Sequence, residues 1–310
     1  MKRILITLAA AVLCAGIASA QDMSKATAAA QAANEALSSG DNALALSGFK
    51  EALSLAQACG EEGTELVSTC KGIIPQIVLS IAKGQLRDGE YDAAIQSLAD
   101  AQAAAKEYEV EEVADEAAGL VGQAYLAKGG SLIKAKDMAG AADAFQKALE
   151  LDPTNGVAAL RLGQALAGAG KTDEAVAALT TAVENGQADA ANKQLSNIYL
   201  RKAQADLKAS KFKEAIADCA KSNEYVESAN AYKLAASAAT KLNDNKEAIA
   251  NYEKYLELAP TAKDAAAITF SVGALYQKSG NNAKAKEYYQ KVVNDPQYGA
   301  QAKQLADSLK

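Results

Sequence analysis

One short pattern returns seven times along this chain of 310 residues. In each copy an alanine is followed four residues later by a larger apolar side chain, and usually by a small residue three positions further on. This spacing places the three side chains on one face of a helix. Helical units that repeat cannot bury such a face alone, so the pattern predicts stacked helical hairpins that bury their core against neighbours. The seven pairs are Ala45/Phe49, Ala94/Leu98, Ala141/Phe145, Ala175/Leu179, Ala215/Cys219, Ala248/Tyr252 and Ala285/Tyr289.

The composition favours helices and excludes several kinds of chemistry. The chain is rich in alanine, which has the highest helix propensity and lets helices approach closely, and it has only four prolines. It contains no histidine, so a Ser-His or Cys-His nucleophile pair and an imidazole metal ligand are both impossible. We therefore expect an all-α protein that is not an enzyme and that needs no cofactor or metal.

Residues 1–20 have the features of a signal peptide. Lys2 and Arg3 form a basic start, the apolar run 4–17 is too short to span a bilayer, and a small-x-small sequence precedes Gln21. We expect cleavage before Gln21 and export, most simply to a periplasm. No later stretch reaches membrane-spanning length without charges, so we expect no membrane insertion after cleavage.

The net charge of −6 narrows the choice of partners. Nucleic acids and anionic membrane surfaces attract basic proteins, so a mildly acidic chain is not expected to bind either of them.

The cysteines leave one question open. Cys59 and Cys70 flank a short loop, and in an oxidising compartment they could form a disulfide. The alternative is two unpaired, half-buried thiols. Cys219 stands where most other copies have a bulky apolar residue, which predicts that it is a core residue.

The best copy, GQALAGAGKTDEAVAALTTAVENG (163–186), resembles the tetratricopeptide repeat (TPR) family. Gly163, Ala175 and Ala182 match the three small positions of that motif, Gly170 matches the turn between its helices, and the third and fourth copies have the family period of 34. This resemblance implies a right-handed superhelical α-solenoid of about seven hairpins over residues 21–297. A capping helix over residues 298–310 would close it.

Some copies depart from the family pattern. The first two periods are 49 and 47 residues, and we expect longer helices to absorb the excess, with one continuous helix over 99–118. The fifth copy has Ser222 at a position where alanine is usual, so this copy matches the motif less well.

The resemblance also implies a binding surface, because family members bind partners on the concave face formed by the first helix of each hairpin. The corresponding surface here would use Lys233 and Arg201 as charged contacts and Asn197 and Asn230 as partners for a peptide backbone. Phe270 would be an apolar anchor.

Two functions remain. The preferred one is a non-enzymatic interaction scaffold or adaptor, exported to the cell envelope, that binds a protein or peptide. The alternative is a soluble envelope module that binds a small ligand or glycan. A groove open along several repeats would favour the first and a closed aromatic pocket the second. The absence of tryptophan disfavours glycan stacking.

Overall fold

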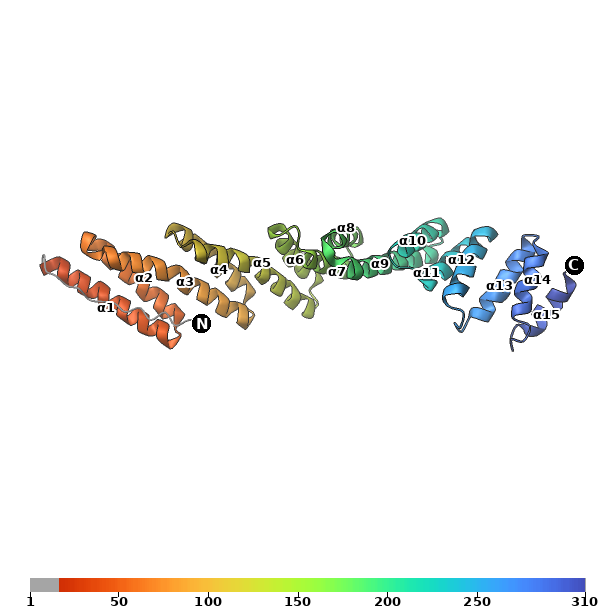
Figure 1. Ribbon diagram of the computed structural model, residues 1–310, viewed down its shortest axis with the longest axis horizontal. Helices are drawn as coiled ribbons and strands as arrows, with labels where there is room; N and C mark the ends of the chain where they lie inside the picture. The colour runs from red at the N-terminus through yellow and green to blue at the C-terminus, as the bar shows by residue number, and fades with distance from the viewer. Residues whose placement is uncertain (1–16, 310) are drawn as a thin grey trace. The chain divides into compact units, whose positions relative to one another are not determined.

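A computed structural model describes residues 17–309 of the chain. Most of the predicted signal peptide therefore lies outside the described residues. The structure divides into two compact units, Met1–Pro153 and Thr154–Lys310. Within residues 17–309 the only regular secondary structure is helical, and no strand occurs. The all-α prediction is confirmed (Figure 1).

The first unit contains three antiparallel hairpins, each packed against the next in chain order. A short 3-10 turn, Gly60–Gly63, connects the first hairpin to the second. The helices are α1 (Ile17–Ser39), α2 (Asn42–Ala58), α3 (Thr64–Asp88), α4 (Tyr91–Glu107), α5 (Glu111–Lys134) and α6 (Met138–Leu151).

The second unit contains four further hairpins followed by a final helix that packs on the last of them. A π-turn, Val183–Gln187, joins its first two hairpins, with Gly186 at a φ of 83°. The helices are α7 (Gly156–Gly168), α8 (Thr172–Ala182), α9 (Ala188–Lys208), α10 (Phe212–Tyr225), α11 (Ala229–Lys241), α12 (Asn245–Leu258), α13 (Ala265–Lys278), α14 (Asn282–Lys291) and α15 (Gly299–Ser308).

The repeated alanines lie where the two helices of a hairpin cross. All seven have an exposed fraction of 0%, and the larger residue four positions later is buried beside each one. Gly163 shows why small residues are needed at the crossing, because a Cβ atom there would lie 2.6 Å from Cγ of Leu179. The repeat register read from the sequence is therefore confirmed.

Longer helices absorb the long periods, as predicted, but the single helix expected over residues 99–118 is wrong. Residues 99–118 do not form one helix, because α4 ends at Glu107 and Glu109 adopts a left-handed φ of 60° before α5 begins. The additional residues lengthen the helices of the early hairpins, so that α3 has 25 residues, α5 has 24, and α2 and α4 have 17 each.

The segment Gly60–Asp88, which contains α3, is long and apolar enough to cross a membrane by length and composition. No stretch of that length in this segment is free of charges, as predicted, because Glu65, Lys71 and Lys83 interrupt it. Half of its most apolar window is also buried inside the unit. Ile74, Ile77 and Leu79 belong to the buried core, which accounts for the composition of this helix without a membrane.

The fifth hairpin replaces apolar packing with a buried hydrogen bond. The hydroxyl groups of Ser196 and Ser222 lie 2.9 Å apart, and the Ser222 hydroxyl also donates to the Ser196 carbonyl oxygen at 3.0 Å. Both serines are buried. Because buried polar groups need partners, the departure at Ser222 is compensated by Ser196 on the neighbouring helix.

The turns inside the hairpins require a positive φ at one position. Glycine occupies it in four hairpins, but Lys136, Ser210 and Asn243 occupy it in the others, with φ values of 64°, 61° and 58°. Left-handed backbone is unfavourable for residues with a Cβ atom, and asparagine tolerates it best.

We expect Lys136→Gly to raise the free energy of unfolding by about 0.5–1 kcal/mol, because glycine adopts this φ without steric strain. Gly89, with a φ of 82° in the preceding hairpin, provides the reciprocal control, since Gly89→Ala should lower stability. Urea unfolding followed by circular dichroism measures both. A lower midpoint for Lys136→Gly would contradict the strain argument.

Candidate partner-binding surface

The predicted partner contacts come from α9, α11 and α13, the first helices of the last three hairpins. We call the exposed side of these three helices the first-helix face. Asn197 and Asn230 occupy equivalent positions on it, each six residues before the small residue at the helix crossing. Asn197, Arg201 and Asn230 are exposed, so these three side chains can reach a partner.

Lys233 is held by the chain itself. Its ammonium group forms an ion pair with Asp264, which precedes α13, and lies 5.5 Å from the ring centre of Tyr255. The Tyr255 hydroxyl donates a hydrogen bond to the same carboxylate. Lys233 therefore connects two consecutive hairpins, and its role as a charged contact for a partner stays a prediction.

These contacts make Asp264 sensitive to acid. The hydrogen bonds from Lys233 and Tyr255 lower the pKa of Asp264 below its ordinary value of 3.8. A carboxylate with a lowered pKa stabilises the fold above its unfolded pKa, and this contribution is lost as the pH falls through the folded pKa.

We expect Asp264→Asn to lower the free energy of unfolding at neutral pH by less than about 1 kcal/mol, because the group is partly exposed. The difference from the unmodified chain should shrink as the pH falls below about 4, where the Asp264 carboxylate becomes protonated. Unfolding midpoints measured across this range test the assignment. A difference that stays constant down to the lowest pH would contradict it.

Phe270 also has a role inside the fold. Its ring centre lies 5.3 Å from that of Tyr289 on α14 and 5.5 Å from that of Tyr298, the residue before α15. The side chain is half-buried and packs on the core cluster that contains Ala302 and Leu309. Phe270 therefore holds the final helix in place, a role that the sequence did not predict.

A further polar cluster joins the last two hairpins. One Glu253 oxygen accepts hydrogen bonds from the hydroxyls of Tyr276 at 2.7 Å and Tyr288 at 2.8 Å. Lys291 lies 4.0 Å from the centre of the Tyr288 ring. Burial and the bond to Glu253 raise the pKa of Tyr276 to about 12. No local sequence pattern indicates this cluster, because Tyr276 and Tyr288 are 23 and 35 residues from Glu253 along the chain.

Cys59 and Cys70 are free thiols in the structure, so the possible disulfide is not formed in it. Burial raises the pKa of Cys70 to about 11, and burial with nearby Asp22 and Glu62 raises the pKa of Cys59. Because the thiolate is the reactive form, neither residue is a good nucleophile at neutral pH. Cys219 is buried, as predicted for a core residue, and burial raises its pKa to about 12.

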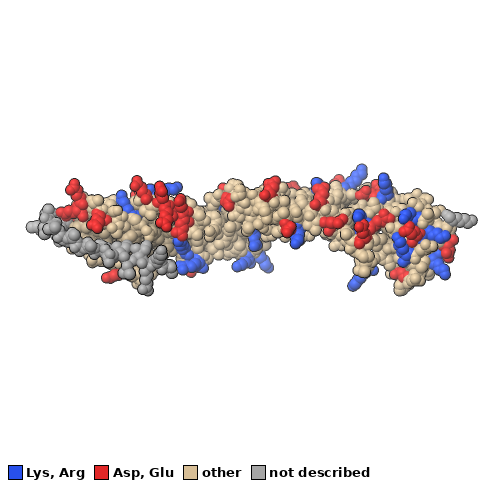
Figure 2. All heavy atoms as spheres, viewed as in Figure 1, with Lys and Arg blue, Asp and Glu red and all other residues tan. Residues whose placement is uncertain are grey.

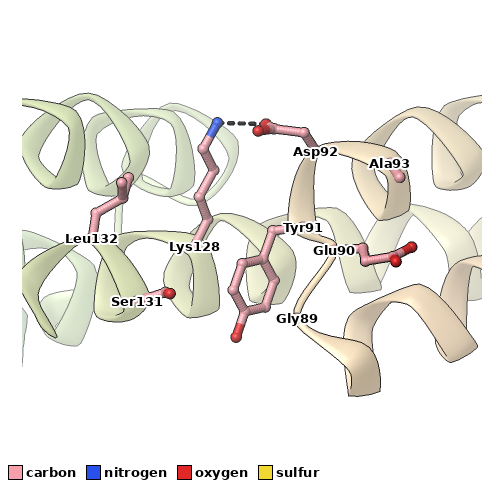
Figure 3. Close-up of a pocket in the computed structure, with 8 residues that line it drawn as sticks. All are labelled: Gly89, Glu90, Tyr91, Asp92, Ala93, Lys128, Ser131 and Leu132. Carbon is pink, nitrogen blue, oxygen red and sulfur yellow. Dashed lines mark hydrogen bonds and ion pairs between the residues drawn. The ribbon is translucent and has the colours of Figure 1, made fainter. Parts of the chain in front are cut away.

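The first unit has an open hollow of about 420 Å³ where the α3–α4 turn faces the end of α5 (Figure 3). Lys128 reaches across its upper edge to Asp92, and Tyr91 and Ser131 lie below this ion pair. The two charges neutralise each other, so the hollow offers a polar contact surface and no evident reactive group. Across residues 17–309, no group of three or more metal-ligating side chains is found.

Charge is distributed unevenly between the two units. Residues 22–153 carry 21 acidic and 10 basic side chains, whereas residues 154–310 carry 17 acidic and 20 basic ones. Figure 2 shows acidic side chains gathered over α4 and α5, while both signs are interspersed over the later helices. The second unit is therefore the better surface for an anionic partner.

Three models of the tetratricopeptide repeat match residues 132–197, residues 79–156, and residues 229–261 together with 269–294. The chain belongs to the tetratricopeptide repeat family. The TPR fold is that of a scaffold for protein–protein interaction, and TPR proteins in general bind protein or peptide partners without catalysing a reaction.

Solved TPR structures resemble the chain at low identity. MamA is 22% identical over 59% of this chain and 96% of its own, with a TM-score of 0.37. YrrB, described as a TPR protein with an unusual peptide-binding site, is 19% identical over 58% and 91%, with a TM-score of 0.33. PilF of Pseudomonas aeruginosa is 15% identical over 74% and 96%, with a TM-score of 0.34. No curated protein sequence matches the chain.

Proposed function

We propose that this TPR protein is an exported adaptor of the cell envelope that holds a protein or peptide segment on the first-helix face of its second unit. The observation that carries this proposal is the exposure of Asn197, Arg201 and Asn230 on neighbouring first helices. Amide side chains can bond an extended peptide backbone, and a guanidinium can bind a carboxylate. The preferred partner is therefore a peptide segment with acidic side chains or a free C-terminal carboxylate.

The ion pair of Lys233 leaves Arg201 as the principal cation of this proposed surface. The guanidinium stays protonated at any physiological pH and binds a carboxylate through two parallel hydrogen bonds. Lys233 would contribute indirectly, by holding the connection between α12 and α13 through Asp264.

A photo-crosslinking amino acid at Asn197 or Asn230 tests the location of the partner. Crosslinks to one and the same protein are expected from both positions. The matched control is a crosslinker at Lys286, an exposed residue on α14. Equal crosslinking from Lys286 would place the binding surface elsewhere.

The charge of Arg201 is tested in the protein that carries the crosslinker at Asn197. There, Arg201→Glu should lower partner recovery about tenfold, because a charge-assisted hydrogen bond is lost and repulsion is added.

Export is part of the same proposal and rests on the basic start, apolar run and small-x-small sequence of residues 1–20. N-terminal sequencing of the protein recovered from a periplasmic fraction should begin at Gln21. Recovery from the cytoplasm with Met1 intact would contradict export and leave the adaptor proposal standing.

A further inference from the structure

The second unit has a hollow of about 360 Å³ on the side formed by second helices. It lies between α10 and α12, with α11 beneath, and these three helices follow one another in Figure 1. Cys219 and Ala235 form part of its floor. Glu224, Glu247 and Asn251 are among the polar residues that line it. The hollow is therefore apolar at its base and acidic at its edge.

The hollow lies beside a departure from the repeat pattern. Cys219 stands where the neighbouring hairpins have Leu179 and Tyr252, so no large side chain extends from α10 at this level. The core cluster beside it has only small fully packed members, Ala203, Cys219, Ala231 and Ala235. Ala220, the next residue of α10, is exposed and lines the hollow as well. Small side chains of both helices therefore line this part of the hollow.

The edge of the hollow has acceptors for a cation. Glu247 accepts a hydrogen bond from the Asn251 amide at 2.9 Å, whereas Glu224 already forms an ion pair with Lys221 at 2.8 Å. A carboxylate can accept about four hydrogen bonds, so Glu247 has capacity for a further donor. Tyr232, whose hydroxyl donates to Glu227 at 3.0 Å, adds an aromatic ring to the lining. Rings attract cations through their faces.

We propose that this hollow binds a lysine side chain of a partner protein. The four-carbon stem would cover Cys219 and Ala235, and the ammonium group would bond the carboxylate of Glu247. A compact ammonium needs no planar pair of acceptors, so a lysine side chain is the proposed occupant and an arginine side chain is not. The site lies on second helices and is separate from the first-helix face, so the protein would have two binding surfaces of opposite charge preference.

The probe is N-acetyl-lysine methylamide, added to the full chain in an NMR titration that follows the backbone amides of Tyr232 and Asn251. Saturable shifts are expected with this probe. N-acetyl-norleucine methylamide, which has a similar stem without the charge, should bind several-fold more weakly. Equal shifts with both compounds, or no saturable shift with the lysine compound, would overturn the proposal.

Variants locate the site. Ala220→Leu should fill the hollow and abolish the shifts, whereas Ala217→Leu adds the same side chain at an exposed position of α10 outside the lining. Glu247→Gln should weaken binding about three- to fivefold, as expected for one partly exposed ion pair. Glu214→Gln on the exposed surface should not weaken it. Binding that survives Ala220→Leu would exclude the hollow. Arg201→Glu should leave binding of the lysine compound unchanged. The proposal for the hollow and the proposal for the first-helix face can therefore be contradicted independently of each other.

Discussion

Replacing Gly63 with alanine will separate α2 from α3 and lower the free energy of unfolding by about 3 kcal/mol. Gly63 is buried in the 3-10 turn between these helices, and a Cβ atom there would fall on the carbonyl oxygen of Ala56. That oxygen belongs to the backbone of α2 and cannot move aside as a flexible side chain could. The helix itself must shift, which disturbs the core around Phe49 and Ile74.

Gly119 provides a control with the opposite sign. It lies in the interior of α5, and a Cβ atom there would meet nothing within 4 Å. Gly119→Ala should therefore raise stability by about 0.5–1 kcal/mol, because alanine costs less conformational entropy in a helix. Thermal and urea unfolding of the full chain measure the change in the free energy of unfolding for each variant. Equal effects of the two substitutions would contradict the packing of α2 against α3 described above.

The second large effect concerns Phe270. Phe270→Ala should lower the free energy of unfolding by roughly 2 kcal/mol, since a half-buried ring and its two aromatic contacts are lost. The loss of structure should be confined to the end of the chain, because each repeat contacts only its neighbours. Hydrogen exchange of the backbone amides of α15 should accelerate strongly, while exchange in α7 and α8 stays unchanged.

The effect of Phe270→Ala on α15 must be known before a binding defect of this variant is interpreted. If Phe270→Ala weakens partner capture, the cause could be loss of an anchor or release of α15. Tyr298→Ala separates the two, because it removes the ring that packs on Phe270 and leaves Phe270 in place. Release of α15 without loss of binding would assign Phe270 to the fold. Unchanged exchange in α15 for both variants would contradict the stacking observed here.

The sequence by itself determined the fold class, the number of hairpins and their register. The alanine repeat is a local signal, because each alanine and its partner four residues later lie on one turn of the same helix. Two prolines marked helix ends in the same way, since α6 ends at Leu151 before Pro153 and α12 ends at Leu258 before Pro260, whereas Pro75 lies inside α3. Local rules of this kind depend only on neighbours along the chain.

The tertiary structure alone decided which candidate residues are free to bind. Lys233 and Phe270 occupy positions that the repeat pattern leaves exposed, but Asp264 and Tyr298 contact them from 31 and 28 residues further along the chain. The hollow beside Cys219 and the hydrogen bond between Ser196 and Ser222 are set by helix-to-helix contacts in the same way. A periodic pattern predicts which face of a helix is buried. It does not predict which distant side chain will pair with a group on the other face, because that depends on how the repeats pack together.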